Sequence, residues 1–281
     1  MSAWIMDNEA TLRLGVFLAV LMSVAVAEGL WPRRERSFPR WRRWPHNLGL
    51  AAVNSFLVRF LYPLAAVGLA AALEDQGLGL LPAIGLPYVL SFVLAVIALD
   101  GAIYFQHVMF HAVPALWRLH RVHHADLDID VTTGARFHPL EIIISMAIKL
   151  MVVAALGPPA LAVVVFEVLL NASSMFNHSN WKLPAELDQR LRRHVVTPDM
   201  HRVHHSILAH ETNSNFGFNL AWWDRLFGTY REQPEAGHEG MTIGIEQFRE
   251  GHELRLDRLL AQPWRGEAGS YSINRRDFDT D

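Results

Sequence analysis

Long apolar stretches alternate with polar segments along this chain. Four of them, at residues 12–30, 48–73, 77–99 and 142–170, are long enough to cross a bilayer, because about 20 apolar residues suffice for one crossing. The stretch at 77–99 carries no charge and is the clearest span, whereas 48–73 is interrupted by Arg59. The fourth stretch contains Gly157-Pro158-Pro159, which favours a hairpin of two helices over one kinked helix.

Basic residues between the first two stretches predict the orientation of the chain. Residues 32–46 hold six arginines against one glutamate, whereas residues 74–76 hold no basic residue. The positive-inside rule therefore places 32–46 in the cytosol. Counting the crossings then places 100–138 and 171–281 on the cytosolic side as well. The excess of arginine over the two lysines is typical of a GC-rich bacterial genome and therefore predicts a bacterial inner membrane.

Composition narrows the class of protein. The chain is 51% hydrophobic with a formal charge of −3, which suits a membrane protein with a sizeable polar part and argues against a nucleic-acid partner. The lack of cysteine excludes disulfides, thiolate metal sites and Cys-ligated iron–sulfur clusters. Electrons for any redox chemistry must then come from another protein or cofactor. Residues 1–10 lack a basic start, which predicts a retained segment.

These patterns predict an all-α protein, with multi-pass membrane helices and a cytosolic helical cap. We expect N-terminal membrane helices and the arginine-rich loop over 1–99, a catalytic part over 100–231 that includes the hairpin, and a cytosolic tail over 232–281. The tail shows a short helical pattern that ends at Leu260, and its last dozen residues are expected to be disordered.

Histidines give the chemical signal. Twelve of the 15 fall between residues 107 and 210. Most belong to three boxes, His107-Val-Met-Phe-His111, His120-Arg-Val-His123-His124 and His201-Arg-Val-His204-His205. Separations of three and four residues place side chains on one face of a helix. His138 and His178 stand at the entry and exit of the predicted hairpin.

The repeated boxes indicate a metal site. A single i, i+4 pair or an adjacent His-His is commonly accidental. Three boxes on one membrane face are not, because so many imidazoles cannot be buried without partners. The boxes together with His138 and His178 make ten histidines, too many for one ion with about four to six ligands. Two ions suit them, and imidazole alone leaves Zn, Cu, Fe and Ni open.

The boxes, interleaved with membrane spans, resemble those of the fatty acid hydroxylase / sterol desaturase superfamily of integral-membrane di-iron enzymes. The resemblance extends over about residues 85–235 through His138-Pro139-Leu140-Glu141, Asn177-His178-Ser179, Asn213-Ser214-Asn215-Phe216-Gly217 and Trp222-Trp223-Asp224-Arg225-Leu226-Phe227-Gly228-Thr229. It implies iron ligation by His107, His111, His120, His123, His124, His178, His201, His204 and His205. His138 is implied as a further ligand or as a residue that supports one.

The resemblance also implies the activity. Two non-haem irons would use O2 as co-substrate to hydroxylate or desaturate a C–H bond of a lipid such as a sterol or fatty acyl chain. Electrons would come from an external ferredoxin- or cytochrome-type protein with its reductase. The boxes do not separate hydroxylation, desaturation and ether cleavage. The alternative is a membrane metal- or haem-binding protein or transporter. Transporters place ionisable ligands near the bilayer midplane, whereas these histidines are expected beyond the ends of the spans. Haem needs only one or two axial histidines and would leave the others unexplained.

Carboxylates are the expected supports of the histidine rings, because a ligating imidazole usually donates its second ring N–H to an acceptor. Five lie close to the boxes or family motifs and are the candidates: Asp100, Asp126, Glu141, Asp199 and Asp224.

Overall fold

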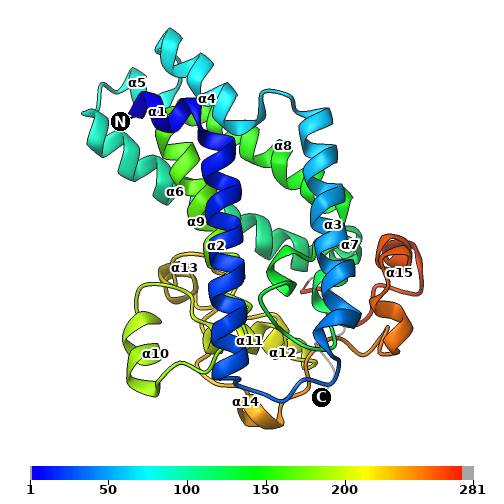
Figure 1. The fold of residues 1–281 in the computed structure, drawn as a ribbon. Coiled ribbons are helices and arrows are strands. Elements are labelled where there is room, and N and C mark those ends of the chain that lie inside the picture. The colour runs from blue at the N-terminus through cyan, green and yellow to red at the C-terminus, as the bar shows by residue number, and fades with distance from the viewer. Residues whose placement is uncertain (1, 274–281) are drawn as a thin grey trace.

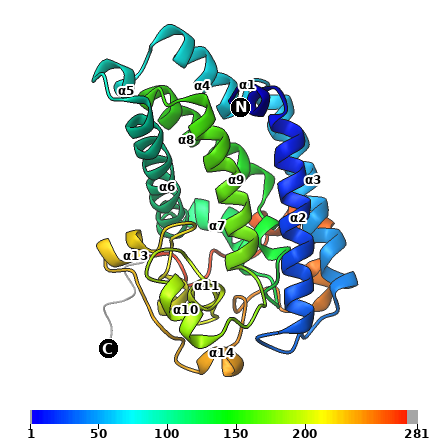
Figure 2. The ribbon, with the colours of Figure 1, turned by 60° about the vertical axis from the view of Figure 1, so that its left-hand side comes forward.

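The computed structural model describes residues 2–273, and its regular elements are all helices over that range. The bundle comprises α1 (Ser2–Asp7), α2 (Glu9–Leu30), α3 (Arg40–Leu61), α4 (Ala65–Gln76), α5 (Leu80–Ala83), α6 (Tyr88–Ala112), α8 (Pro139–Leu156) and α9 (Ala160–Asn177). The cap comprises α7 (Pro114–His124), α10 (Ala185–Leu191), α11 (Pro198–His204), α12 (Ala209–Thr212), α13 (Trp222–Leu226), α14 (Gly237–Gly240) and α15 (Leu256–Ala261). In both ribbon views α10, α11 and α14 lie at the end of the bundle far from the N-terminus (Figure 1, Figure 2).

Five segments of the described chain are long and apolar enough to span a membrane: Glu9–Leu30, Arg40–Ala83, Tyr88–Ala112, Pro139–Leu156 and Ala160–Asn177. Their outer faces carry large apolar side chains, such as Phe56, Phe60 and Val89, each at least 70% exposed. Contiguous apolar surface of this kind suits lipid better than water. The predicted class, an all-α multi-pass membrane protein with a histidine-rich cap, is confirmed.

The predicted hairpin is also confirmed. Helices α8 and α9 are joined by residues 157–159, and Gly157 has the left-handed backbone that ends α8 (φ 58°). A Cβ atom at Gly157 would lie 1.9 Å from the carbonyl oxygen of Leu78. Glycine is therefore required both by the backbone angle and by the close approach of the chain before α5.

The third predicted span is wrong in its position. Residues 77–87 form a turn and the short α5, and α6 begins only at Tyr88. Gly77 ends α4 in the left-handed region, and Pro87 is the extended residue before α6, so these residues interrupt the apolar run. Helix α6 then continues to Ala112. His107 and His111 consequently belong to the last turns of a membrane-length helix and do not follow its end.

The second predicted span is two helices. Helix α3 ends at Leu61 and α4 begins at Ala65, with Pro63 between them. Proline has no N–H for the helical hydrogen bond and clashes with the preceding turn, which accounts for the break. Helix α4 packs on both helices of the hairpin through a core that includes Ala66, Ala70 and Val163.

Most arginines of the segment 32–46 point into the protein. Arg43 is fully buried and donates to Asp126 at 2.7 and 2.9 Å and to Asp130 at 2.6 Å. Arg34 donates to the carbonyl oxygens of His238 and Met241. This segment therefore joins the first two membrane helices to the cap.

The C-terminal segment packs against the chain between the first two histidine boxes. Tyr271 is buried and stacks on Trp117 with ring centroids 5.5 Å apart. Ser272 donates to the carbonyl oxygen of Ala112 at 2.9 Å. The expected disorder of the last dozen residues is therefore wrong for Tyr271 and Ser272, and the part of that expectation on 274–281 lies outside the described residues.

Candidate metal centre

Nine histidines meet where the bundle joins the cap. They come from the last turns of α6, from α7, from the end of α9 and from α11, and they are His107, His111, His120, His123, His124, His178, His201, His204 and His205. Each is at most 3% exposed. Segments almost 100 residues apart in the sequence therefore meet in one buried site.

The nine form two groups, and within each group the ligand atoms lie within 4.8 Å of one another. The first group is His107, His111, His120, His124 and His204, and the second is His123, His178, His201 and His205. The H-x-x-H-H spacing explains this division. In α7 the i and i+4 histidines face the first group and the i+3 histidine faces the second, whereas at α11 the assignment is reversed.

Hydrogen bonds at Nδ1 set the tautomers in the first group. His107 Nδ1 lies 2.7 Å from the carbonyl oxygen of Phe216, and His120 Nδ1 lies 2.6 Å from Glu141 Oε1. A carbonyl oxygen can only accept, so Nδ1 of His107 carries its proton, and an ionised Glu141 likewise accepts from Nδ1 of His120. Their Nε2 atoms are therefore unprotonated, and these two atoms face each other at 3.0 Å.

The second group repeats this arrangement. His123 Nδ1 is 3.3 Å from the carbonyl oxygen of Arg136, and His178 Nδ1 is 2.6 Å from that of Ser174. The Nε2 atoms of His123 and His178 are again 3.0 Å apart. His201 Nε2 approaches His178 Nε2 at the same distance of 3.0 Å.

This chemistry fits metal ions. Two buried nitrogens that face each other with lone pairs repel unless a cation lies between them. Two imidazole nitrogens each about 2.1 Å from one ion, at right angles, would be about 3.0 Å apart. Further ring nitrogens are buried without a hydrogen-bond partner, among them His111 Nε2, His204 Nε2 and both nitrogens of His124 and His205. A buried polar atom in this state is costly, and ligation removes the cost.

Burial keeps the cap histidines neutral. Desolvation lowers the pKa of His120 and of His178 to about 3. Desolvation, followed by repulsion from neighbouring histidines, also holds the pKa of His201, His204 and His205 well below 6.5. Imidazole must be neutral to bind a metal, so the site is in its metal-binding form at neutral pH.

His138 is not brought to either group in the described structure. It is the N-cap of α8: its Nδ1 accepts from the backbone N–H of Leu140 at 3.2 Å. Its Nε2 lies 3.2 Å from the carbonyl oxygen of Leu260, and its ring packs against Trp264. The helix start and the C-terminal segment thus occupy both ring nitrogens.

Only Glu141 among the five candidate carboxylates contacts a grouped histidine in the described structure. Asp126 binds Arg43 and Thr133. Desolvation raises the pKa of Asp126, but the neighbouring arginines outweigh it and hold that pKa at about 2. Asp199 pairs with Arg33 and Arg202. These two carboxylates stabilise the surrounding framework instead of the rings.

Asp100 and Asp224 bind residues of the segment 216–223 instead of the histidine rings. Asp224 accepts from the backbone N–H groups of Phe216 and Gly217 at 2.7 and 2.9 Å, and burial raises its pKa to about 6. It thereby holds the loop whose Phe216 carbonyl orients His107. Asp100 accepts from Trp223 at 2.8 Å and from Asn219 at 2.7 Å.

Sequence reasoning missed the acceptors that orient most rings. These are the backbone carbonyls of Arg136, Ser174, Ser214 and Phe216 and the side chain of Asn213. Three of them lie within the family motif 213–217, which had no assigned role in the site. The clustering of that motif after the third box is the signal that could have identified them.

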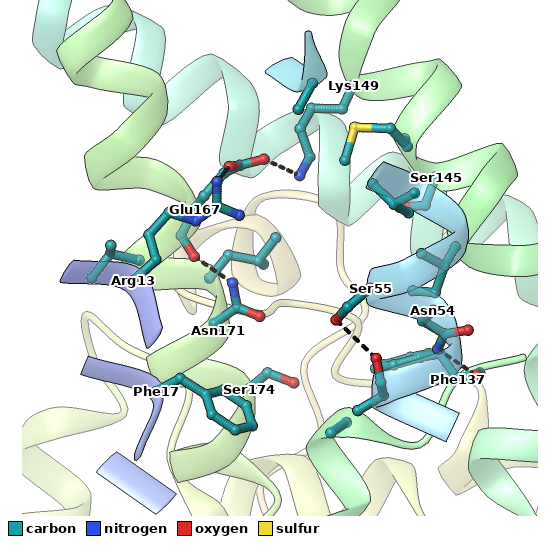
Figure 3. Close-up of a pocket in the computed structure, with 18 of the residues that line it drawn as sticks. Arg13, Phe17, Asn54, Ser55, Phe137, Ser145, Lys149, Glu167, Asn171 and Ser174 are labelled. Atoms are coloured by element: carbon teal, nitrogen blue, oxygen red, sulfur yellow. Dashed lines mark hydrogen bonds and ion pairs between the residues drawn. The ribbon is translucent and has the colours of Figure 1, made fainter. Parts of the chain in front are cut away.

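A cavity of about 930 Å³ leads to the first histidine group. It lies among α2, α3, α6, α8 and α9 and is lined mainly by apolar side chains. His107, His120 and Glu141 line its inner part. Figure 3 shows the polar side chains on its walls, with Glu167 and Asn171 on one side and Asn54 and Ser55 on the other. The cavity can hold an elongated apolar molecule with one part beside the histidines.

Membrane-length helices with a buried histidine-rich site and an apolar cavity define a helical membrane protein equipped to bind metal and a lipophilic molecule. Residues 92–229 match the family model described as fatty acid hydroxylase. This segment contains both histidine groups, and it belongs to the fatty acid hydroxylase family. The resemblance seen in the boxes is confirmed.

Three relatives indicate what similar proteins do. The chain is 29% identical to an ornithine lipid hydroxylase of Rhizobium tropici over 57% of its own length and 46% of the relative's. It is 29% identical to the human alkylglycerol monooxygenase over 55% of its length and 34% of the relative's, and 29% identical to the rat cholesterol 25-hydroxylase over 58% and 56%. The chain thus spans roughly a third to a half of these relatives. No solved structure matches it significantly.

Proposed function

We propose that this protein is a di-iron membrane oxidoreductase that uses O2 to hydroxylate a C–H bond of a lipid, with desaturation as the alternative outcome. The proposal is supported by the family of residues 92–229 and by relatives named as lipid hydroxylases or monooxygenases. Zinc is redox-inactive, so chemistry of this kind favours iron among the metals that imidazole binds.

One observation carries the proposal: unprotonated Nε2 atoms face each other at 3.0 Å in both histidine groups, and the lipid-sized cavity reaches the first group. When bound, the irons would supply the redox chemistry that activates O2 for attack on a C–H bond, which no side chain can achieve. The first group would hold one ion and the second group the other.

The chain's own residues hold the site in place. Glu141 Oε1 accepts the Nδ1 proton of His120 and so directs Nε2 of that ring to the ion position. The carbonyl oxygen of Phe216 does the same for His107. Because ligand orientation tunes both affinity and reactivity, these acceptors are positioning groups for the reaction.

The cavity would bind and orient the substrate. Its wall near the histidines includes Ile103, Phe110, Phe137 and Phe218, which exclude water from the reacting carbon. Because the cavity lies among helices that span the membrane, a lipid could enter it without passing through water. The volume of about 930 Å³ is sufficient for a long alkyl chain or a sterol.

Further parts of the proposal concern the surroundings. The arginine-rich segment supports an orientation with the cap in the cytosol. The excess of arginine over lysine supports a bacterial inner membrane as the location. Electrons would come from a ferredoxin- or cytochrome-type protein docking on the cap. We keep the division into membrane helices (1–99), catalytic part (100–231) and C-terminal tail (232–281) as a proposal.

Metal analysis tests the cofactor. The full chain, purified in mild detergent after growth with iron, should contain close to two irons, because each histidine group has enough ligands for one ion. His204→Ala should lower the iron content, whereas His194→Ala, outside both groups, should not. One zinc per chain, or no metal, would contradict the proposal.

Lipid profiling tests the activity. Extracts from cells with and without the protein are compared by mass spectrometry, and the active chain should produce lipids that have gained one oxygen atom or lost two hydrogens. The His204→Ala variant should produce neither. If iron-loaded protein supplied with an electron donor and O2 changes no lipid class, the oxidoreductase proposal is wrong.

A further inference from the structure

Three charged side chains meet on the wall of the cavity at the level of the membrane helices. Glu167 of α9 accepts from Lys149 of α8 at 2.7 Å and pairs with Arg13 of α2 at 2.9 Å. Figure 3 shows the three side chains together on one side of the cavity. Glu167 is almost fully buried and the Lys149 side chain is 11% exposed. We call these residues the charged triad.

Charges among membrane helices are costly and usually mark a function. The triad is not needed to hold the histidine groups, because none of its members contacts a grouped histidine in the described structure. All three line the cavity. Two cations converge on the single buried carboxylate of Glu167, and Arg13 also pairs with the partly exposed Glu9, which likewise lines the cavity.

The triad retains unused hydrogen-bond donors. Lys149 has three N–H groups and gives one to Glu167. Arg13 donates a hydrogen bond to Glu9 through Nη1, and its Nε and Nη2 donate to no group among residues 2–273. Arg59, which also lines the cavity, adds a further positive charge without an ion pair in that range. These free donors, together with the charge of Arg59, are complementary to an anionic oxygen.

Two rows of polar side chains connect the triad with the metal centre. On α8, Lys149, Ser145 and Glu141 are spaced four residues apart along the cavity, and Glu141 binds His120. On α9, Glu167, Asn171 and Ser174 form the second row. Eight residues separate Lys149 from Glu141, which corresponds to about 12 Å along the helix axis. A ligand bound at the triad would thus present an atom about this far away to the histidines.

We propose that the charged triad binds an anionic oxygen of the lipid, a carboxylate or a phosphate, and thereby selects which carbon lies beside the metal centre. This inference rests on the proposed function for the identity of the reaction, and on the cavity alone for the binding. Lys149 and Arg13 are the specificity-determining residues, and Glu167 holds their side chains in position.

Equilibrium binding tests the proposal without any turnover. The immobilised full chain in uncharged detergent is given tritiated oleate, and oleyl alcohol and 1-oleoyl lysophosphatidate compete for the site. We expect one of the two anions to bind at least about tenfold more tightly than the alcohol, as charge-assisted hydrogen bonds predict. Preference for oleate identifies a carboxylate and preference for the lysophosphatidate a phosphate, and either result supports the proposal.

Variants assign the preference to the triad. Lys149→Met should reduce the preference for the anion to near unity, and Lys149→Arg should restore most of it. Because Lys149→Met leaves Glu167 with one partner fewer, the double variant Lys149→Met/Glu167→Gln serves as a second test in which both charges are absent. Lys182→Met is the matched control, since Lys182 is exposed and does not line the cavity. Iron content and melting temperature verify that each variant is folded.

Two results would overturn the inference: native protein that binds neither anion better than the alcohol, or a folded double variant that keeps the full preference. Failure of the proposed function is distinguishable from both. Protein that shows the preference but oxidises no lipid would refute the activity and leave the triad's role intact. Protein that oxidises lipids without the preference would refute the triad's role alone.

Discussion

His123 and His138 both belong to family motifs, but their ring nitrogens have different partners. His123 Nε2 faces His178 Nε2 at 3.0 Å, whereas His138 caps α8 through Leu140. We expect His123→Ala to lose at least half of the bound iron. His138→Ala should keep the native iron content and lose about 1 kcal/mol of stability with its helix cap. Elemental analysis and thermal unfolding of both variants test this, and equal iron loss would contradict it.

Glu141 is a second residue whose replacement should change metal binding. Its carboxylate is buried and accepts from His120 at 2.6 Å. Glutamine keeps the size but is a weaker acceptor, so Glu141→Gln should lower iron affinity by about 10- to 100-fold. Competition with a chelator measures this.

The matched control for Glu141 is Glu186→Gln, because the Glu186 side chain is 88% exposed on α10 and pairs with Arg190 instead of a histidine. It should leave the iron affinity unchanged. An unchanged affinity in Glu141→Gln would show that the backbone carbonyls are sufficient to orient the ligands.

The α8–α9 hairpin raises a prediction at the scale of elements. Gly157 has φ 58°, and a Cβ atom there would meet the Leu78 carbonyl. Left-handed backbone costs a non-glycine residue about 1–2 kcal/mol before any clash. Gly157→Ala should therefore lower the melting temperature by several degrees and shift α5 away from the hairpin.

Gly15→Ala is the control for this hairpin variant. Gly15 lies within α2, and a Cβ atom there would meet nothing within 4 Å. Since alanine is about 1 kcal/mol more favourable than glycine inside a helix, this variant should be at least as stable as the native protein. If both variants have the melting temperature of the native chain, the close approach of α5 to the hairpin is not a constraint.

At the scale of the whole molecule, the buried histidines make stability depend on pH. Burial lowers the pKa of His120 and His178 to about 3, whereas an unfolded chain protonates its histidines near pH 6.5. Below pH 6.5 the unfolded state therefore binds more protons, and the free energy of unfolding falls with decreasing pH. At pH 5 the loss is about 2 kcal/mol for each of these two histidines.

Acid should also release the metal, because protons compete for the same ring nitrogens. We expect iron content and melting temperature to be constant between pH 7 and 8 and to fall together between about pH 6.5 and 5. Dialysis at each pH followed by metal analysis and thermal unfolding measures both quantities. A melting temperature that is unchanged at pH 5 would contradict the neutral state of the buried cluster.

Patterns local in sequence were sufficient for much of this protein. Apolar runs indicated α2 and the α8–α9 hairpin, because membrane helices are selected by the hydropathy of a continuous segment. The i, i+3 and i+4 spacings of the boxes indicated that their histidines act together, because helical periodicity alone places such side chains on one face. Nine of the ten candidate ligands meet in the two groups.

Only the tertiary structure decided what depends on distant contacts. His138 lies apart from the two groups, where Leu260 and Trp264 pack on it from more than 100 residues away in the sequence. The rings of His107 and His204 are oriented by carbonyls of residues 214–216, which every residue type carries and which no sequence pattern distinguishes. Arg13 lies in the first apolar stretch and Lys149 and Glu167 lie in the fourth, and only the packing of α2, α8 and α9 brings the three together at the cavity.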